Sequence, residues 1–213
     1  MLKVTDVGKV LGPRRVLDRI SFEVGQAEVA VVRGGNGSGK STLLRVVCGV
    51  LVADHGDVAI GGHSMRRDEA RAKANVGYVP DATDALPELL AREFVDLVRV
   101  LKGGPKGPAP LPVDSLIERT GFRAFEGQSM GGLSFGQRKR TCLVAALCGD
   151  PPLLVLDEPS NGLDPEGVEL ILAIVDERTR SDRATLLSTN DVTFAERIGG
   201  TRYRLSAGKL TRA

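Results

Sequence analysis

One stretch of this chain decides its fold: Gly34-Gly35-Asn36-Gly37-Ser38-Gly39-Lys40-Ser41-Thr42. It follows an apolar run that ends at Val32 and precedes an apolar segment closed by Gly49, so it predicts a strand, a glycine-rich loop and a helix. Glycines let the backbone curl until several N–H groups point at one anion, and the helix adds its positive N-terminal end. We therefore expect Lys40 to reach the β- and γ-phosphates of a nucleotide and Ser41 to ligate Mg²⁺.

The composition limits the classes of protein to consider. The 213 residues carry 29 Lys and Arg against 27 Asp and Glu, a net charge of +2, and 42% of them are apolar. This length fits one domain, or one domain with a subdomain, around a sizeable core. Balanced charge, the absence of Trp and only 4% aromatic residues argue against nucleic acid as a partner.

The cysteines and the lack of long apolar runs indicate a cytoplasmic protein. Cys48, Cys142 and Cys148 form no metal-ligand pattern and lie in apolar segments, so we expect them to be buried and reduced. No apolar run approaches the ~18 residues that span a bilayer. The first residues lack the apolar core of a signal peptide. If the protein works at a membrane, another subunit must supply the span.

Short segments of β-type composition dominate the first third of the chain, at 2–7, 20–24, 28–33, 58–60 and 76–79. Apolar spacings of one, three and four predict a helix from Leu86 to Leu101. Three Gly and four Pro within residues 103–112 predict a surface loop.

The second half of the chain alternates predicted helices and strands. Helices are expected at about 113–120 and from Ser134 to Cys148, buried strands at 153–156 and 184–188, and a terminal hairpin over 203–211. These elements predict an α/β nucleotide-binding core interrupted by a mostly helical insertion from about residue 82 to 150.

Two adjacent carboxylates, Asp157 and Glu158, follow the apolar run Leu153–Leu156. Ligands bind at the carboxyl ends of strands in open α/β sheets, and adjacent strand residues point to opposite sides. Asp157 is therefore a candidate for the Mg²⁺ shell, and Glu158 for the base or for the group that positions water. The alternative is a solvated acidic strand end, which the phosphate loop upstream disfavours.

A second helix start has the chemistry of an anion site. Ser134 and Gln137 form the capping-box pattern Ser-x-x-Gln within Gly132-Leu133-Ser134-Phe135-Gly136-Gln137. Taken alone, this pattern also describes an ordinary helix cap. A simple ATPase with one site does not need two anion-ready helix starts.

Together these motifs resemble those of the ATP-binding subunits of ABC (ATP-binding cassette) transporters. The matching segments are Walker A at 34–42, the LSGGQ signature at 133–137, Walker B at 153–158, the D-loop at 160–164 and the start of the switch at 187–189. The specific feature is the signature lying before Walker B, and the resemblance covers nearly the whole chain.

The resemblance implies the fold and the partners. It implies an α/β fold: a P-loop NTPase core of ABC type with an N-terminal β-rich part and an inserted helical subdomain. The chain would be a single ABC ATP-binding domain over 1–213, with its core at 1–81 and 151–213 and its helical subdomain at about 82–150. It would bind ATP and Mg²⁺ and work with a separate transmembrane permease subunit, docked near Asp81 and the helix that begins near Leu86.

The family also implies a head-to-tail dimer, with a second ATP-binding subunit that is either identical or different. ATP would lie between Walker A of one subunit and the signature of the other. Ser134 and the N–H of Gly136, with Gln137 in the same motif, would then contact a γ-phosphate held by the partner.

Four residues depart from the family pattern. Asn190 stands where the switch usually has His, and it cannot carry a proton near pH 7, so it predicts slow hydrolysis. Asp81 stands where the Q-loop has Gln and still offers oxygen to Mg²⁺ or to water, which makes it a candidate catalytic and metal residue. Leu11 takes the place of the aromatic that stacks on adenine, a loss of ~1–3 kcal/mol. Phe135 replaces a signature Gly.

We therefore expect an ATPase subunit that powers a membrane transporter by ATP-driven dimer closure, peripheral on the inner face of the cell membrane. The short length, without a further C-terminal domain, resembles small exporter subunits. Two alternatives stay open: a poorly hydrolysing regulatory subunit of a heterodimeric ABC system, and a soluble ABC ATPase. The transported substrate is read by the membrane subunit and is not encoded in this sequence.

Overall fold

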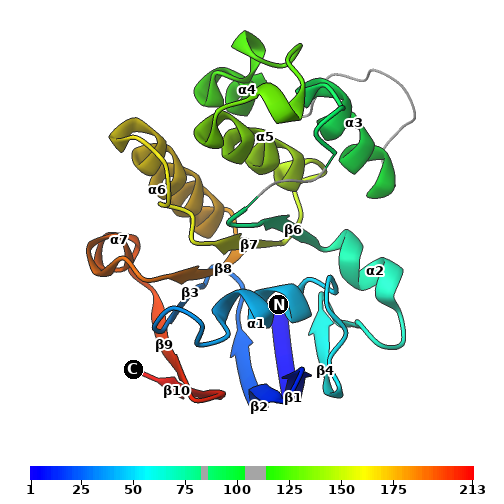
Figure 1. Ribbon diagram of the computed structural model, residues 1–213, viewed down its shortest axis with the longest axis vertical. Coiled ribbons are helices and arrows are strands. Elements are labelled where there is room, and N and C mark those ends of the chain that lie inside the picture. Colours follow the sequence, from blue (N-terminus) through cyan, green and yellow to red (C-terminus); the bar gives the residue numbers. More distant parts are fainter. Residues whose placement is uncertain (83–85, 104–113) are drawn as a thin grey trace.

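The computed structural model describes residues 1–82, 86–103 and 114–213 (Figure 1). Its strands are β1 (Leu2–Leu11), β2 (Arg14–Val24), β3 (Val29–Arg33), β4 (His55–Ile60), β5 (His63–Ser64), β6 (Val76–Val79), β7 (Leu153–Asp157), β8 (Ala184–Thr189), β9 (Thr201–Ser206) and β10 (Lys209–Arg212). Its helices are α1 (Lys40–Val47), α2 (Glu69–Ala74), α3 (Ala91–Leu101), α4 (Asp114–Thr120), α5 (Phe135–Leu147), α6 (Pro165–Arg180) and α7 (Val192–Ile198).

Two sheets form the frame. The larger has the order β10-β9-β3-β8-β7-β6, in which all neighbours are parallel except the β9–β10 hairpin. The smaller is antiparallel, in the order β2-β1-β4-β5. Helices α3, α4 and α5 gather at one end of the molecule, and β1, β2 and β4 lie at the other (Figure 1). The carboxyl ends of β3, β7 and β8 therefore lie together at one edge, which is where α/β folds place ligands.

Each face of the larger sheet carries its own core. Along β3, Val31 packs with α5 and α6 residues, whereas Val32 packs with α1 and the smaller sheet. On β7, Leu154 belongs to the same core as Val31, and Val155 belongs to the same core as Val32. Alternate strand residues point to opposite faces, so continuous apolar runs are what a sheet covered on both faces requires. The buried strands predicted at 153–156 and 184–188 are confirmed.

The predicted helix at 86–101 begins too early, because α3 starts at Ala91. Leu86 has a φ of +55°, outside the right-handed helical region, and it precedes Pro87, whose ring disfavours helical backbone before it. The Leu90 N–H instead bonds to Glu93 Oε2 at 2.9 Å, which caps α3. Within the described ranges, no helix combines the length and apolarity needed to cross a bilayer.

The remaining predicted elements agree with the structure. Helix α5 and the hairpin β9–β10 occur as expected, and Cys48, Cys142 and Cys148 are free and buried. Gly49, at φ +67°, follows α1 as its expected end. Of the predicted loop at 103–112, residues 104–112 lie outside the described residues. The division into a core and a helical subdomain stays a prediction.

Candidate nucleotide site

The glycine-rich loop joins β3 to α1 and is shaped for an anion. Gly37 and Gly39 have φ values of +69° and +105°, which side chains rarely adopt. A Cβ at Gly39 would lie 2.8 Å from Val16 Cγ1, so the smaller sheet presses on this turn. The Ser38 hydroxyl is buried and has no hydrogen-bond partner among the described residues. A loop with turned-in backbone and an unused hydroxyl fits the phosphates of ATP.

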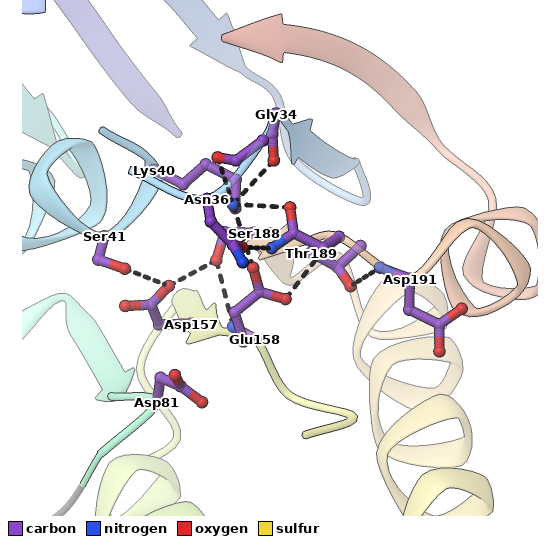
Figure 2. A network of polar contacts seen from close by, with 12 residues as sticks. Gly34, Asn36, Lys40, Ser41, Asp81, Asp157, Glu158, Ser188, Thr189 and Asp191 are labelled. Atoms are coloured by element: carbon purple, nitrogen blue, oxygen red, sulfur yellow. Dashed lines mark hydrogen bonds and ion pairs between the residues drawn. The ribbon is translucent and has the colours of Figure 1, made fainter. Parts of the chain in front are cut away.

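Lys40 lies at the centre of the site, with only 6% of its surface exposed. Its ammonium donates to Gly34 O at 2.9 Å, to Gly35 O at 3.4 Å and to Asn190 Oδ1 at 2.8 Å. It also lies 3.2 Å from Glu158 Oε1 (Figure 2). These contacts bring the phosphate loop and the ends of β7 and β8 together around one positive charge, so the ammonium is positioned to meet an anion.

Three oxygens meet beside the start of α1. Ser41 Oγ donates to Asp157 Oδ1 at 3.1 Å, and Ser188 Oγ donates to the same oxygen at 2.6 Å (Figure 2). Asp157 is 1% exposed. Mg²⁺ binds in proteins through one or two carboxylate or hydroxyl oxygens together with substrate phosphates and water. Ser41 and Asp157 fit that donor set.

Glu158 faces the loop from the end of β7. Its Oε2 accepts from the Asn190 N–H at 3.0 Å, and its own N–H donates to Ser188 O at 3.1 Å. Its φ of +45° lies in the left-handed region, which costs a residue with a Cβ about 1–2 kcal/mol. Such strain is characteristic of functional positions. The turn aims the carboxylate at Lys40.

Asn190 connects the end of β8 to the phosphate loop. Besides accepting from Lys40, its side-chain amide donates to Asn36 Oδ1 at 2.6 Å. The sequence-predicted residues Asn36, Lys40, Glu158 and Asn190 therefore form one connected network. Asn36 and Asn190 are 154 positions apart in the sequence. The order of the strands in the larger sheet brings them together.

Asp81 takes a different position. Its Oδ1 accepts from Asn161 Nδ2 at 3.3 Å and lies 3.7 Å from Lys139 Nζ. Figure 2 shows the Asp81 carboxylate apart from the dashed contacts that join Ser41, Asp157 and Glu158. The metal and catalytic roles predicted for Asp81 stay predictions.

The capping box at the start of α5 is confirmed. The Gln137 N–H donates to Ser134 Oγ at 3.2 Å, and the Ser134 N–H donates to Gln137 Oε1 at 2.9 Å. Among the described residues, no hydrogen bond joins Ser134, Gly136 or Gln137 to residues 34–42 of the same chain. Their predicted contact with a nucleotide held by a partner stays a prediction.

The tip of the β1–β2 hairpin reaches the phosphate loop. Leu11 is 43% exposed at this tip, and Arg14 Nη2 donates to Gly37 O at 3.0 Å. Arg14 and Lys139 are the two site neighbours that sequence reasoning missed. Lys139 lies in the basic run Arg138-Lys139-Arg140, and the structure shows that it is the buried residue of the three, where Lys is rarely found without partners.

Comparisons with known proteins agree with this geometry. The profile of the family described as ABC transporter matches residues 17–161. The glutamate/aspartate import ATP-binding protein GltL of Escherichia coli (strain K12) is 33% identical over 215 residues, covering 99% of this chain and 89% of that protein. The Nod factor export ATP-binding protein I of Rhizobium etli is 30% identical over 194 residues, covering 91% of this chain and 61% of that protein.

Solved structures show the same fold. An ATP-binding subunit of an ABC transporter superposes with a TM-score of 0.91 at 24% identity, covering 100% of this chain and 89% of that chain. The dimeric bacterial ABC transporter cassette MJ0796 gives a TM-score of 0.87 at 23% identity, covering 100% and 97%. With the matched family profile and the order of its motifs, this chain belongs to the ABC transporter family, as an ATP-binding subunit of α/β fold.

Proposed function

We propose that this chain binds ATP with Mg²⁺ and hydrolyses it to drive a separate membrane permease. The family to which it belongs couples ATP hydrolysis to transport. The observation that carries the proposal is the convergence of Lys40, Glu158 and Asp157 on one glycine-rich loop. A buried cation, a carboxylate for water and a carboxylate for metal are the groups that phosphoryl transfer needs.

Each residue has a role that follows from its contacts. Lys40, already held by two loop carbonyls, would exchange them for phosphate oxygens. Glu158 would orient the attacking water, since its carboxylate faces the loop. Asn190 would donate its amide to the γ-phosphate. Mg²⁺, held by Ser41 and Asp157, would neutralise charge that develops on the phosphates.

The start of α5 supports dimer closure. Ser134 and Gly136 sit at an exposed helix N-terminus, whose free N–H groups favour an anion. The fold is that of MJ0796, a cassette solved as a dimer. In our proposal, two subunits pair head to tail, and each signature closes on the ATP held by the other.

The permease would dock in a groove between α3, α5 and the end of α1, with a volume of about 260 Å³. Apolar side chains of Phe94, Val98 and Met130 line it, together with Lys73 and Lys102. Burial lowers the pKa of Lys102 to about 8. An apolar segment of the membrane subunit that carries a carboxylate would satisfy both features. This docking would place the chain on the cytoplasmic face of the membrane.

We propose slow hydrolysis, because Asn190 is a neutral donor where the family usually has His. A regulatory role beside a more active partner subunit is the alternative that Asn190 and Leu11 favour. For the direction of transport we propose export, the function named for the Nod factor protein of Rhizobium etli. Import is the second candidate, since GltL, an import protein, is 33% identical over nearly the whole chain.

Lys40→Ala tests the proposal. The variant should lose ATP binding in isothermal titration calorimetry, because Lys40 supplies the positive side chain that the loop places against the β- and γ-phosphates. Lys73→Ala is the matched control, since Lys73 pairs with Glu69 on α2 at 2.7 Å. Equal ATP affinity in all three proteins would refute the phosphate site. The direction of transport is then measured with vesicles that contain this chain and its permease, by supplying the transported substrate on one side of the membrane.

A further inference from the structure

Lys139 is a buried lysine whose side chain spans three motifs. It lies in the second turn of α5 with 3% of its surface exposed. Its ammonium donates to Glu158 O at 2.5 Å and to Asn161 O at 3.1 Å, and it lies 3.7 Å from Asp81 Oδ1. An ammonium has three N–H donors. Two of them bond to backbone carbonyls of Walker B and the D-loop, and the ammonium forms an ion pair with Asp81, just after β6.

An ion pair with Asp81 favours the charged form of Lys139. Burial lowers the pKa of Lys139, while the carboxylates of Asp81, Asp157 and Glu158 oppose that shift. A buried cation without a partner is costly. Asp157 and Glu158 are engaged elsewhere, with Ser41, Ser188, Lys40 and the Asn190 N–H. Asp81 is therefore the carboxylate that pairs directly with Lys139.

The surroundings hold the same segment at two more points. The Phe135 ring lies 5.3 Å from Lys139 Nζ and packs over Gly162, where any Cβ would overlap it. Arg140 Nη2 lies 3.1 Å from Asp164 Oδ1. The first two turns of α5 thus contact segment 158–164 along its length, but Lys139 is the one side chain among these three that bonds to the backbone of Glu158.

We propose that Lys139 is a positioning residue for ATP hydrolysis: it fixes the main chain of Glu158 and Asn161, and Asp81 acts through Lys139. This inference rests on the proposed function. The Glu158 carbonyl is bonded to Lys139 while its carboxylate faces Lys40, so the lysine holds the strained turn that aims the carboxylate. Without Lys139, the turn is free to relax and the carboxylate leaves the position from which it orients water.

A double-mutant cycle tests this on the full-length chain. Lys139→Met keeps the apolar stem and removes the donors, and Asp81→Asn keeps the size and removes the charge. Arg140→Met is the matched control, because it removes a cation and an ion pair from the same helix without touching Glu158. Steady-state hydrolysis of MgATP gives kcat and KM for each protein. Lys139→Gln, which keeps a neutral N–H donor group on a shorter side chain, serves if the Met variant does not fold.

The expected result is a loss of kcat of about tenfold or more in Lys139→Met with KM changed less than about threefold, since the phosphate loop is untouched. Lys139→Gln should lose less, and Arg140→Met should change kcat less than about twofold. Asp81→Asn should lower kcat in the wild-type background and have no further effect in Lys139→Met. Equal effects of Asp81→Asn in both backgrounds would overturn the inference and favour a separate metal role for Asp81.

Hydrogen exchange of residues 158–164 tests the link without catalysis. The backbone amides from Glu158 to Asn161 should exchange faster in Lys139→Met and at the wild-type rate in Arg140→Met, since Lys139, unlike Arg140, bonds to the Glu158 and Asn161 carbonyls. Unchanged exchange in Lys139→Met would overturn the inference. If the wild-type chain, with its partners, hydrolyses no ATP, the proposed function fails, and the exchange experiment still decides the role of Lys139.

Discussion

Replacing Asn190 by His should speed hydrolysis with little change in ATP affinity. The backbone at this position is fixed, because the Asn190 N–H donates to Glu158 Oε2 at 3.0 Å. The side chain reaches Lys40 at 2.8 Å and Asn36 at 2.6 Å, directly over the phosphate loop. An imidazole on the same backbone would reach the place where the γ-phosphate is expected.

The magnitude follows from the charge of the donor. The Asn190 amide is a neutral donor, and a charge-assisted hydrogen bond is roughly twice as strong. A protonated imidazole would add about 2 kcal/mol where negative charge develops, or roughly thirtyfold in rate. The variant loses the bond from Lys40 to Asn190 Oδ1. When ATP is bound, its phosphates accept from Lys40 in place of Asn190 Oδ1. The loss of this hydrogen bond therefore destabilises the nucleotide-free protein and not the ATP complex.

Single-turnover hydrolysis at equal ATP occupancy measures the effect. Asn190→Gln is the control, since it keeps a neutral amide on a longer side chain and should not gain. The advantage of the His variant should be larger at pH 6 than at pH 8, because an unperturbed imidazole has a pKa of about 6.5. A rate for Asn190→His that is unchanged or lower, at both pH values, would refute the reasoning and leave Glu158 as the limiting group.

Three further predictions concern other parts of the site and the groove. Glu158→Gln should keep ATP binding, slow hydrolysis sharply and trap a dimer with ATP and Mg²⁺; a monomer at high protein concentration in light scattering would contradict this. GTP should compete with ATP to within about tenfold, or 1.4 kcal/mol, because exposed Leu11 offers the base only apolar contact; a much stronger ATP preference in competition binding would reveal another stacking group. Burial lowers the pKa of Lys102 from 10.5 to about 8, so the folded state holds fewer protons between these values and stability rises with pH across that window. Lys102→Met should therefore stabilise the chain at pH 7 by on the order of 2 kcal/mol, after loss of the bond to Ala146 O, and by less at pH 10 in urea unfolding.

The parts of the fold that local sequence determines could be predicted. The phosphate loop needs glycine at Gly37 and Gly39 for its positive φ values, and such requirements are visible in the sequence. The predicted start of α3 was wrong because the apolar spacing continues on both sides of Pro87, where the proline disfavours helical backbone. Helix α6 is absent from the predicted elements, even though Asp164 and Pro165 are a typical N-cap and first residue.

The residues of the candidate site likewise fall into those that the sequence could identify and those that it could not. Lys40, Asp157, Glu158 and Asn190 could be identified because each has a motif around it. The role of Lys139 could not be predicted, because its acceptors are backbone carbonyls 19 and 22 residues away. Backbone carbonyls occur at every residue, so the side chains there give no sign of the contact. Likewise, Asp81 could be located at the end of β6, but its contact with Asn161 depends on how β6 and β7 lie side by side.

The packing of Phe135 over Gly162 ties the evolution of these two positions together. Gly162 has a φ of +67° and the Phe135 ring over its Cα, so a side chain there clashes while Phe135 is present. The order of mutations then matters: Phe135→Gly must come before a change such as Gly162→Asn, and the reverse path crosses an unstable intermediate. Aligned relatives should accordingly show covariation, with large residues at 135 accompanied by glycine at 162.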